Sequence, residues 1–147
     1  MAVELEQLTR ERAAAIVAGD LSSVDAADGW PHADTLDGLR MAANPENEPP
    51  WLVVLDGVVV GDCGTVRPPV DGSVEIGYGL AEAFRGRGIG SEAVRQLGEL
   101  LLARPDVRRL TAEVLLDNVA SHRVLEKNGF AVERSDGEHA LYVKPSG

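Results

Sequence analysis

The pattern of apolar and polar positions predicts a chain in which strands and helices are mixed. Short alternating or apolar segments indicate seven strands, and longer segments with a helical period indicate four helices. The third helix is the clearest, because Ile89, Ala93, Leu97 and Leu101 recur on one stripe. The strands are expected at 3–8, 51–55, 58–66, 73–80, 109–116, 130–134 and 139–143, and the helices at 10–18, 35–42, 90–103 and 118–127.

Turn residues connect these elements in an order that indicates the fold class. Asp56-Gly57 is a strong two-residue hairpin turn, and Asp136-Gly137 lies inside the final hairpin. The order is strand, two helices, a three-strand meander, helix, strand, helix and hairpin. This order predicts an α/β (mixed α+β) fold, a twisted mixed sheet of about seven strands with helices on both faces. With 147 residues, we expect a single domain over 1–147 with one core.

A glycine-rich stretch, Arg85-Gly86-Arg87-Gly88-Ile89-Gly90, lies between the strand at 73–80 and the helix at 90–103. Glycines allow several backbone N–H groups to point into one small volume, and the helix N-terminus adds positive potential. Arg85 and Arg87 can add charge-assisted contacts to phosphate oxygens. The stretch, continued to Ser91, is therefore predicted to bind a pyrophosphate.

Two other interpretations of this stretch compete with a pyrophosphate site. One is a flexible glycine turn before a surface helix. The other is a dinucleotide fingerprint, because residues 88–93 satisfy G-x-G-x-x-A. That fingerprint belongs on the first βα turn of a doubly wound domain. Here hairpins precede the strand, and too little chain follows Gly90 for a complete nucleotide-binding pair. A Walker loop is excluded, because no Gly-Lys-Ser/Thr follows.

The motif Arg85-x-x-Gly88-x-Gly90 resembles the Q/R-x-x-G-x-G/A signature of the GNAT superfamily of N-acetyltransferases. Upstream, the Val-Glu-Ile-Gly-Tyr-Gly-Leu run at 74–80 resembles the fourth strand of that family. Downstream, residues 118–130 resemble its N-x-x-S-x-x-V-L-E-K-x-G-F segment, in the form typical of the ribosomal-protein-alanine acetyltransferase branch. The resemblance implies the GNAT fold, with strands four and five splayed apart and acetyl-CoA entering the wedge between them.

One face of the strand at 73–80 is almost bare, because it carries Glu75, Gly77 and Gly79. Glycine weakens a strand interior unless something must approach the backbone closely. A thioester arm that pairs with exposed strand groups would be such a ligand. The alternative is a sheet face covered by a helix that needs small residues beneath it.

Glu75 is the candidate general base. An alkylamine has a pKa near ~10.4, so it arrives protonated at pH 7 and cannot attack a thioester. A carboxylate in a partly desolvated cleft can take that proton, directly or through water. Glu75 lies ten residues before Arg85, at a position similar to the catalytic glutamate of the histone-acetylating branch. The alternative is an exposed strand glutamate, since many family members lack a base here and use water.

The remaining predicted roles follow from the same chemistry and resemblance. The N–H of Gly79 or Leu80 is a candidate donor to the tetrahedral oxyanion. Many family members place a tyrosine that acts as a general acid where this chain has Leu125. The resemblance therefore assigns the role of an acid near the coenzyme sulfur to Ser121. The alternative for Ser121 is a residue at the start of the helix that hydrogen-bonds to local backbone. Asn118 is either a coenzyme contact or a helix cap. The expected coenzyme contacts are Gly79, Leu80, Arg85, Gly86, Arg87, Gly88, Ile89, Gly90, Ser91, Asn118 and Ser121.

The distribution of charge bears on which amine would accept the acetyl group. The net charge is −10, and residues 19–50 hold seven acidic side chains against one arginine. An acidic surface disfavours nucleic acid and attracts a cationic amine, although it can equally be a solvated loop. His32 and Trp30 lie in this segment as candidate walls of an acceptor pocket, with a surface histidine as the alternative for His32.

Composition bears on metal binding and on the cellular location of the protein. The single cysteine, Cys63, cannot build a disulfide framework or a zinc site, so no metal is expected. No apolar run approaches ~18 residues and the first residues lack the features of a signal peptide, so we expect a cytoplasmic protein that does not associate with membranes. The family resemblance makes a homodimer plausible. The sequence thus predicts an acetyl-CoA-dependent N-acetyltransferase that acts on a primary amine by direct transfer. A non-catalytic acyl-CoA sensor is the alternative, and a kinase or dehydrogenase is a distant third.

Overall fold

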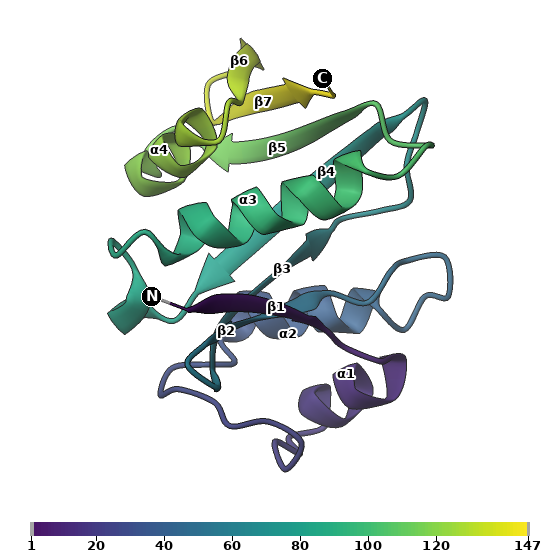
Figure 1. Ribbon diagram of the computed structural model, residues 1–147, viewed down its shortest axis with the longest axis vertical. Helices are drawn as coiled ribbons and strands as arrows, with labels where there is room; N and C mark the ends of the chain where they lie inside the picture. Colours follow the sequence, from purple (N-terminus) through teal and green to yellow (C-terminus); the bar gives the residue numbers. More distant parts are fainter. Residues whose placement is uncertain (1, 147) are drawn as a thin grey trace.

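A computed structural model describes residues 2–146 and contains one seven-stranded sheet (Figure 1). Neighbouring strands are antiparallel except for the central β4–β5 pair, which is parallel. The mixed sheet of seven strands is therefore confirmed. In spatial order the strands are β1 (Val3–Gln7), β2 (Trp51–Leu55), β3 (Val58–Thr65), β4 (Ser73–Leu80), β5 (Arg109–Leu115), β7 (His139–Pro145) and β6 (Ala131–Ser135).

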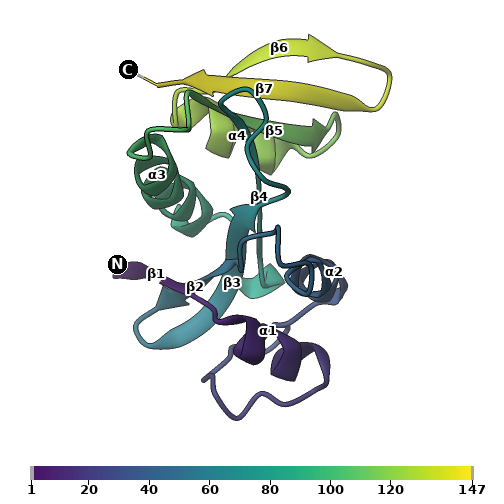
Figure 2. The same cartoon turned by 90° about the vertical axis from the view of Figure 1, so that its right-hand side faces the viewer.

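Helices cover both faces of the sheet, as predicted (Figure 2). One face packs α3 and α4 into the larger apolar core, and the other packs α1 and α2 into a second one. Adjacent β2 residues show the division, because Leu52 belongs to the second core and Val53 to the first. The helices are α1 (Arg10–Val17), α2 (Ala33–Met41), α3 (Ile89–Leu102) and α4 (Val119–Lys127), with a 3₁₀ turn, η1 (Glu82–Phe84).

Helix ends follow the capping residues of the sequence. The Thr9 side chain accepts a hydrogen bond from the Arg12 N–H at the start of α1. Helix α2 begins two residues earlier than expected, because His32 caps it instead of a residue nearer 35. The Asn118 side chain caps α4, and Gly129 follows the helix in the left-handed conformation, with φ of 85°.

Strands β4 and β5 pair over only three residues, from Ser73 to Glu75 on β4. Beyond Glu75 they diverge, while β4 stays paired with β3 as far as Leu80. One edge of β4 is therefore unpaired over residues 76–80, which confirms the predicted splay. Helix α3 begins at the open end of this wedge (Figure 1).

The register of β3 and β4 decides which backbone groups face the wedge. Ala81 N–H donates to the Val60 carbonyl and Val66 N–H to the Glu75 carbonyl, and hydrogen-bonded pairs alternate along an antiparallel ladder. The N–H groups of residues 77 and 79 therefore point toward β3. Those of residues 76, 78 and 80 point into the wedge, where no strand pairs with them.

The helices of residues 2–146 are each too short or too polar to cross a membrane.

Candidate active site

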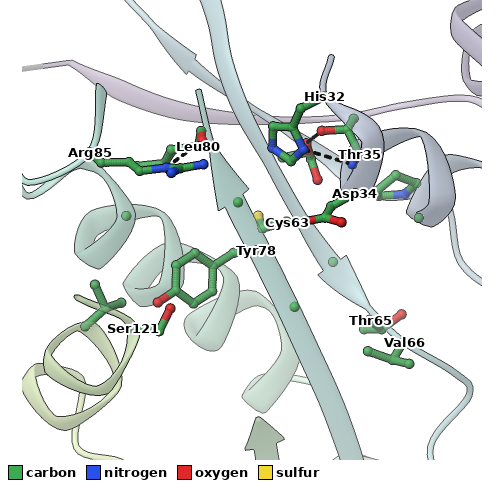
Figure 3. Close-up of a pocket in the computed structure, with 18 of the residues that line it drawn as sticks. His32, Asp34, Thr35, Cys63, Thr65, Val66, Tyr78, Leu80, Arg85 and Ser121 are labelled. Atoms are coloured by element: carbon green, nitrogen blue, oxygen red, sulfur yellow. Dashed lines mark hydrogen bonds between the residues drawn. The ribbon is translucent and has the colours of Figure 1, made fainter. Parts of the chain in front are cut away.

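One cleft of about 820 Å³ runs from the glycine-rich loop, across the splayed edge of β4, to helix α2 (Figure 3). Most of the predicted coenzyme contacts lie in its wall. Strand β4 contributes two of them, the loop and the start of α3 five, and α4 with its cap two. They are Gly79, Leu80, Arg85, Gly86, Gly88, Gly90, Ser91, Asn118 and Ser121.

The glycine-rich loop has the backbone expected of an anion seat. Gly86 and Gly88 adopt φ of 76° and 81°, a region that favours glycine, and no side chain caps α3 at Gly88. The first N–H groups of α3 therefore have no partner within the helix and face the cleft end of the loop. Arg85 Nε donates to the Leu80 carbonyl at 3.2 Å, which ties the loop to the end of β4.

Two predicted coenzyme contacts lie outside the cleft wall. The Arg87 guanidinium stacks over the Phe84 ring, 5.3 Å from its centroid. The Ile89 side chain is fully buried in the larger core, so this residue can offer only its backbone N–H to a ligand. The contacts of these two residues with coenzyme remain predictions.

Tyr78 joins the site although the sequence analysis assigned it no role of its own. Its side chain lies in the wedge, with the hydroxyl facing Ser121 of α4 (Figure 3). That hydroxyl is buried and has no partner of acceptable geometry among residues 2–146. Burial raises the pKa of Tyr78, and the nearby Ser121 hydroxyl opposes this effect. The signal in the sequence was a tyrosine between two strand glycines.

The predicted residues at α4 have structural roles, and two of them also line the cleft. Asn118 Oδ1 accepts from the Ser121 N–H at 3.2 Å, so both residues do act at the start of the helix. Both also line the cleft, so capping does not exclude a coenzyme contact, which remains a prediction. Leu125 is fully buried in the larger core, so no acid acts from that position.

Glu75 lies away from the cleft wall. Its carboxylate is 3.1 Å from Arg67 Nη2, and its side chain is about a quarter exposed, at 26%. Its role as a base remains a prediction. Of the bare face, Gly77 looks onto open space, whereas Gly79 lies under His32. A covered face thus describes Gly79, and the approach of a thioester arm near Gly77 remains a prediction.

Asp62 of β3 is a site residue that sequence reasoning missed. Its Oδ2 accepts hydrogen bonds from Trp30 Nε1 at 2.9 Å and from Thr35 Oγ1 at 2.7 Å. Burial raises the pKa of Asp62, while the Thr35 and Trp30 hydrogen bonds and the nearby His32 lower it. The signal in the sequence was a carboxylate inside a largely apolar strand, and only the structure shows that it lies directly opposite Gly79.

His32 lines the cleft, as one of the two interpretations expected, whereas Trp30 is not part of the cleft wall. Nδ1 of His32 accepts from the Thr35 N–H at 3.3 Å, so in the neutral ring the proton resides on Nε2. Nε2 is buried, finds no partner among residues 2–146, and lies 3.3 Å from where a Cβ on Gly79 would stand. Trp30 is buried and reaches the site only through Asp62.

Charge in the cleft is divided between its ends. Arg85, Arg123 and Lys127 line the end near the glycine-rich loop and α4, and the acidic side chains line the α2 end. Glu48 is paired with Arg104 at 2.7 Å, so among the described residues Asp34 and Asp62 are the acidic groups of this wall without an ion pair to Lys or Arg. Within residues 2–146, no cluster of three His, Cys, Asp or Glu side chains could hold a metal ion.

Comparison with known families agrees with this geometry. The family described as Acetyltransferase (GNAT) domain matches residues 3–131. The chain belongs to the GNAT acetyltransferase family. Its relatives include an uncharacterized N-acetyltransferase of Bacillus subtilis (strain 168), YjdG, 34% identical over 63% of this chain and 58% of that protein. The ribosomal-protein-serine acetyltransferase of Escherichia coli (strain K12) is 35% identical over 44% of this chain and 36% of that protein.

The chain thus spans less than two thirds of either relative's length. Solved structures share the fold over nearly the whole chain. RimL, a ribosomal L7/L12 α-N-protein acetyltransferase in complex with coenzyme A, has a TM-score of 0.73 at 20% identity, over 99% of this chain and 94% of that one. The acetyltransferase AAC(6')-Ib with ribostamycin and coenzyme A has a TM-score of 0.71 at 22% identity, over the same shares.

Proposed function

We propose that this GNAT domain transfers an acetyl group from acetyl-CoA directly to a primary amine. The observation that carries the proposal is the unpaired edge of β4 over residues 76–80. It lies in a single cleft between a basic glycine-rich loop and an acidic wall at α2. An anionic coenzyme and a cationic amine would therefore enter from opposite ends and meet at β4.

The coenzyme half of the cleft would bind acetyl-CoA through three kinds of contact. The pyrophosphate would accept hydrogen bonds from the free N–H groups at the start of α3. Arg85, Arg123 and Lys127 would add charge. The amide-rich arm would pair with the free edge of β4, and Asn118 would contact it from α4.

The reaction centre would lie at the end of β4. Of the two oxyanion donors expected there, the Leu80 N–H faces the wedge and the Gly79 N–H faces β3. Leu80 is thus the better placed donor to the tetrahedral oxygen. Ser121 would hydrogen-bond to the departing thiolate, with the Tyr78 hydroxyl beside it. A thiol pKa near ~8.5 makes that thiolate a fair leaving group with modest assistance.

The acceptor is proposed as a cationic primary amine, either the N-terminus of a protein or peptide or a small molecule. The named relatives cover both kinds, a ribosomal-protein-serine acetyltransferase and a structure with an aminoglycoside. The two acidic groups without a cation, Asp34 and Asp62, support the cationic character.

A non-catalytic acyl-CoA sensor is the second candidate, and two observations favour it. Leu125 replaces the usual acid, and Glu75 is held by Arg67 outside the cleft wall. Such a sensor would bind acetyl-CoA and turn nothing over.

Calorimetry and an amine panel test both candidates. Acetyl-CoA is titrated into the protein with NADH as the control, and thiol release is then followed with a free seryl peptide, kanamycin and spermidine. Acetyl-CoA binding with amine-dependent release supports the transferase. Binding without release on any amine supports the sensor, and no acetyl-CoA binding would exclude both.

A further inference from the structure

Asp62 is a half-buried carboxylate without a cation. Among residues 2–146 no Lys or Arg side chain forms an ion pair with it, and its hydrogen bonds come from Trp30 and Thr35 alone. A buried charge is expensive unless an opposite charge compensates it. Since Asp62 lines the cleft, that compensation can arrive with a ligand.

The hydrogen bonds leave half of this carboxylate free. Both donors reach Oδ2, so they fix the plane of the group and leave Oδ1 without a partner among the described residues. A fixed carboxylate with one open oxygen is suited to receive an ammonium and then its proton.

Asp62 also lies beside the proposed reaction centre. It is the register partner of Gly79, and directly opposed residues place their side chains about 5 Å apart on one face of a sheet. Gly79 has no side chain, and the next residue, Leu80, offers the N–H that faces the wedge. A nitrogen held at Asp62 would therefore lie next to the thioester carbonyl.

His32 supplies the second unsatisfied group at this place. Its Nε2–H is buried, unpartnered among residues 2–146, and next to Gly79. A donor cannot bind an ammonium, so its ligand atom must be an oxygen. A peptide N-terminus and an amino sugar both carry an oxygen within a few bonds of the amine nitrogen, whereas an alkyl polyamine carries none.

We propose that Asp62 binds the acceptor ammonium and removes its proton, and that His32 positions the acceptor by donating to an oxygen near the amine. The inference rests on the proposed transferase function. An N–H bond of the ammonium breaks as an O–H bond forms on Oδ1, and the neutral amine then forms the C–N bond. Collapse of the adduct breaks the C–S bond. The second nitrogen proton ends on the thiolate, and Asp62 returns the first proton to solvent.

The charged groups facing Asp62 fit this role. They are His32, which caps α2, and Asp34 in the first turn of that helix. Asp34 disfavours a second negative charge nearby, as burial does, so the carboxylate is a stronger proton acceptor than an exposed aspartate.

The test compares Asp62→Asn with Glu75→Gln, two isosteric changes at the two candidate bases. The amide of D62N keeps one oxygen that can accept from Trp30 and Thr35, so folding should persist, and acetyl-CoA calorimetry confirms it. On the best acceptor of the panel, D62N should lose about 100-fold in kcat/KM at pH 7, and E75Q only a few-fold. The D62N rate should rise about tenfold per pH unit as free amine accumulates, whereas the wild-type rate levels off.

Three outcomes separate the proposed role of Asp62 from the proposed transferase function. Wild-type turnover with D62N within about threefold of it and an unchanged pH profile would overturn the role of Asp62 and leave the transferase standing. A large loss in E75Q alone would do the same in favour of Glu75. Acetyl-CoA binding without turnover of any amine would remove the transferase function and this inference together.

Two further measurements do not depend on how the departing thiolate receives its proton. The Asp62 carboxyl is titrated by carbon NMR in the wild-type protein, and a pKa at or below the ordinary value of ~3.9 would overturn its role as base. His32→Asn keeps an oxygen that can cap α2 and removes the Nε2–H. It should raise KM several-fold more than it lowers kcat for the seryl peptide; equal KM values would remove His32 from the proposal.

Discussion

At the scale of residues, the site depends on polar atoms that the fold buries without partners. His32 Nε2 and the Tyr78 hydroxyl are such atoms among residues 2–146, and both face the cleft region at β4. Buried polar groups are normally satisfied, since an unsatisfied one costs about 1–3 kcal/mol. These two atoms lie on opposite faces of β4 in one cleft, which supports the proposal that this cleft is adapted to a ligand instead of to stability.

Asp62 should therefore reduce stability at neutral pH. Because its pKa is raised in the folded protein, the charged form is better tolerated in the unfolded chain, and stability contributed by the protonated form is lost as pH rises through the folded pKa. D62N should melt at a higher temperature than the wild type at pH 7. The difference should shrink toward zero below the unfolded pKa of ~3.9.

Thermal melts of both proteins from about pH 3.5 to 8 check this prediction, with E75Q as the control. Glu75 is partly exposed beside Arg67, so E75Q should not show a stabilisation that grows with pH. A D62N protein less stable than the wild type at pH 7 would contradict the expected cost of the buried charge.

At the scale of elements, α4 begins where structural and functional needs coincide. Asn118 caps the helix through Oδ1 and lines the cleft at the same time. Strand β4 shows the same overlap, because one edge holds the sheet together while the other stays unpaired over residues 76–80, where the coenzyme arm is proposed to bind. Substitutions that keep the structural role of such a residue can therefore test its proposed functional role separately.

Asn118→Asp and Asn118→Ala should separate capping from coenzyme binding. Aspartate retains the oxygen that accepts from Ser121 N–H, so N118D should keep the wild-type melting temperature, whereas N118A should lose about 1 kcal/mol of stability. N118D places a negative charge near an anionic coenzyme and should weaken acetyl-CoA binding several-fold. Unchanged acetyl-CoA affinity in both variants would leave Asn118 as a cap alone.

At the scale of the whole molecule, an acidic protein carries a locally basic site. The net charge is −10, yet one end of the cleft gathers Arg85, Arg123 and Lys127. The overall charge opposes an anionic coenzyme at long range and attracts a cationic acceptor. The local cluster must therefore supply the attraction for the coenzyme, and it should be sensitive to salt.

Lys127→Gln and Lys144→Gln change the net charge equally and differ only in place. Lys127 lines the cleft, and Lys144 lies on β7 outside it. K127Q should weaken acetyl-CoA binding several-fold at low salt, with the difference falling as ionic strength rises, while K144Q should bind as the wild type does. Equal effects of the two variants, measured by calorimetry, would indicate that net charge alone matters.

The sequence by itself determined the elements, their order and most of the residues at one end of the cleft. Hydrophobic periodicity, the Asp-Gly turns and the capping residues are local signals, and a glycine-rich loop between a strand and a helix carries its chemistry in consecutive residues. For the same reason, nine of the expected coenzyme contacts were found in one cleft.

Only the tertiary structure decided which carboxylate faces the cleft and which N–H groups lie in the wedge. Strand alternation put Glu75 on the glycine face but did not reveal its pairing with Arg67, and Asp62 looked like an ordinary strand residue. The acceptor end joins α2, β3 and β4, which are distant in sequence. Register and cross-element packing determine such a site, and neither leaves a local pattern in the sequence.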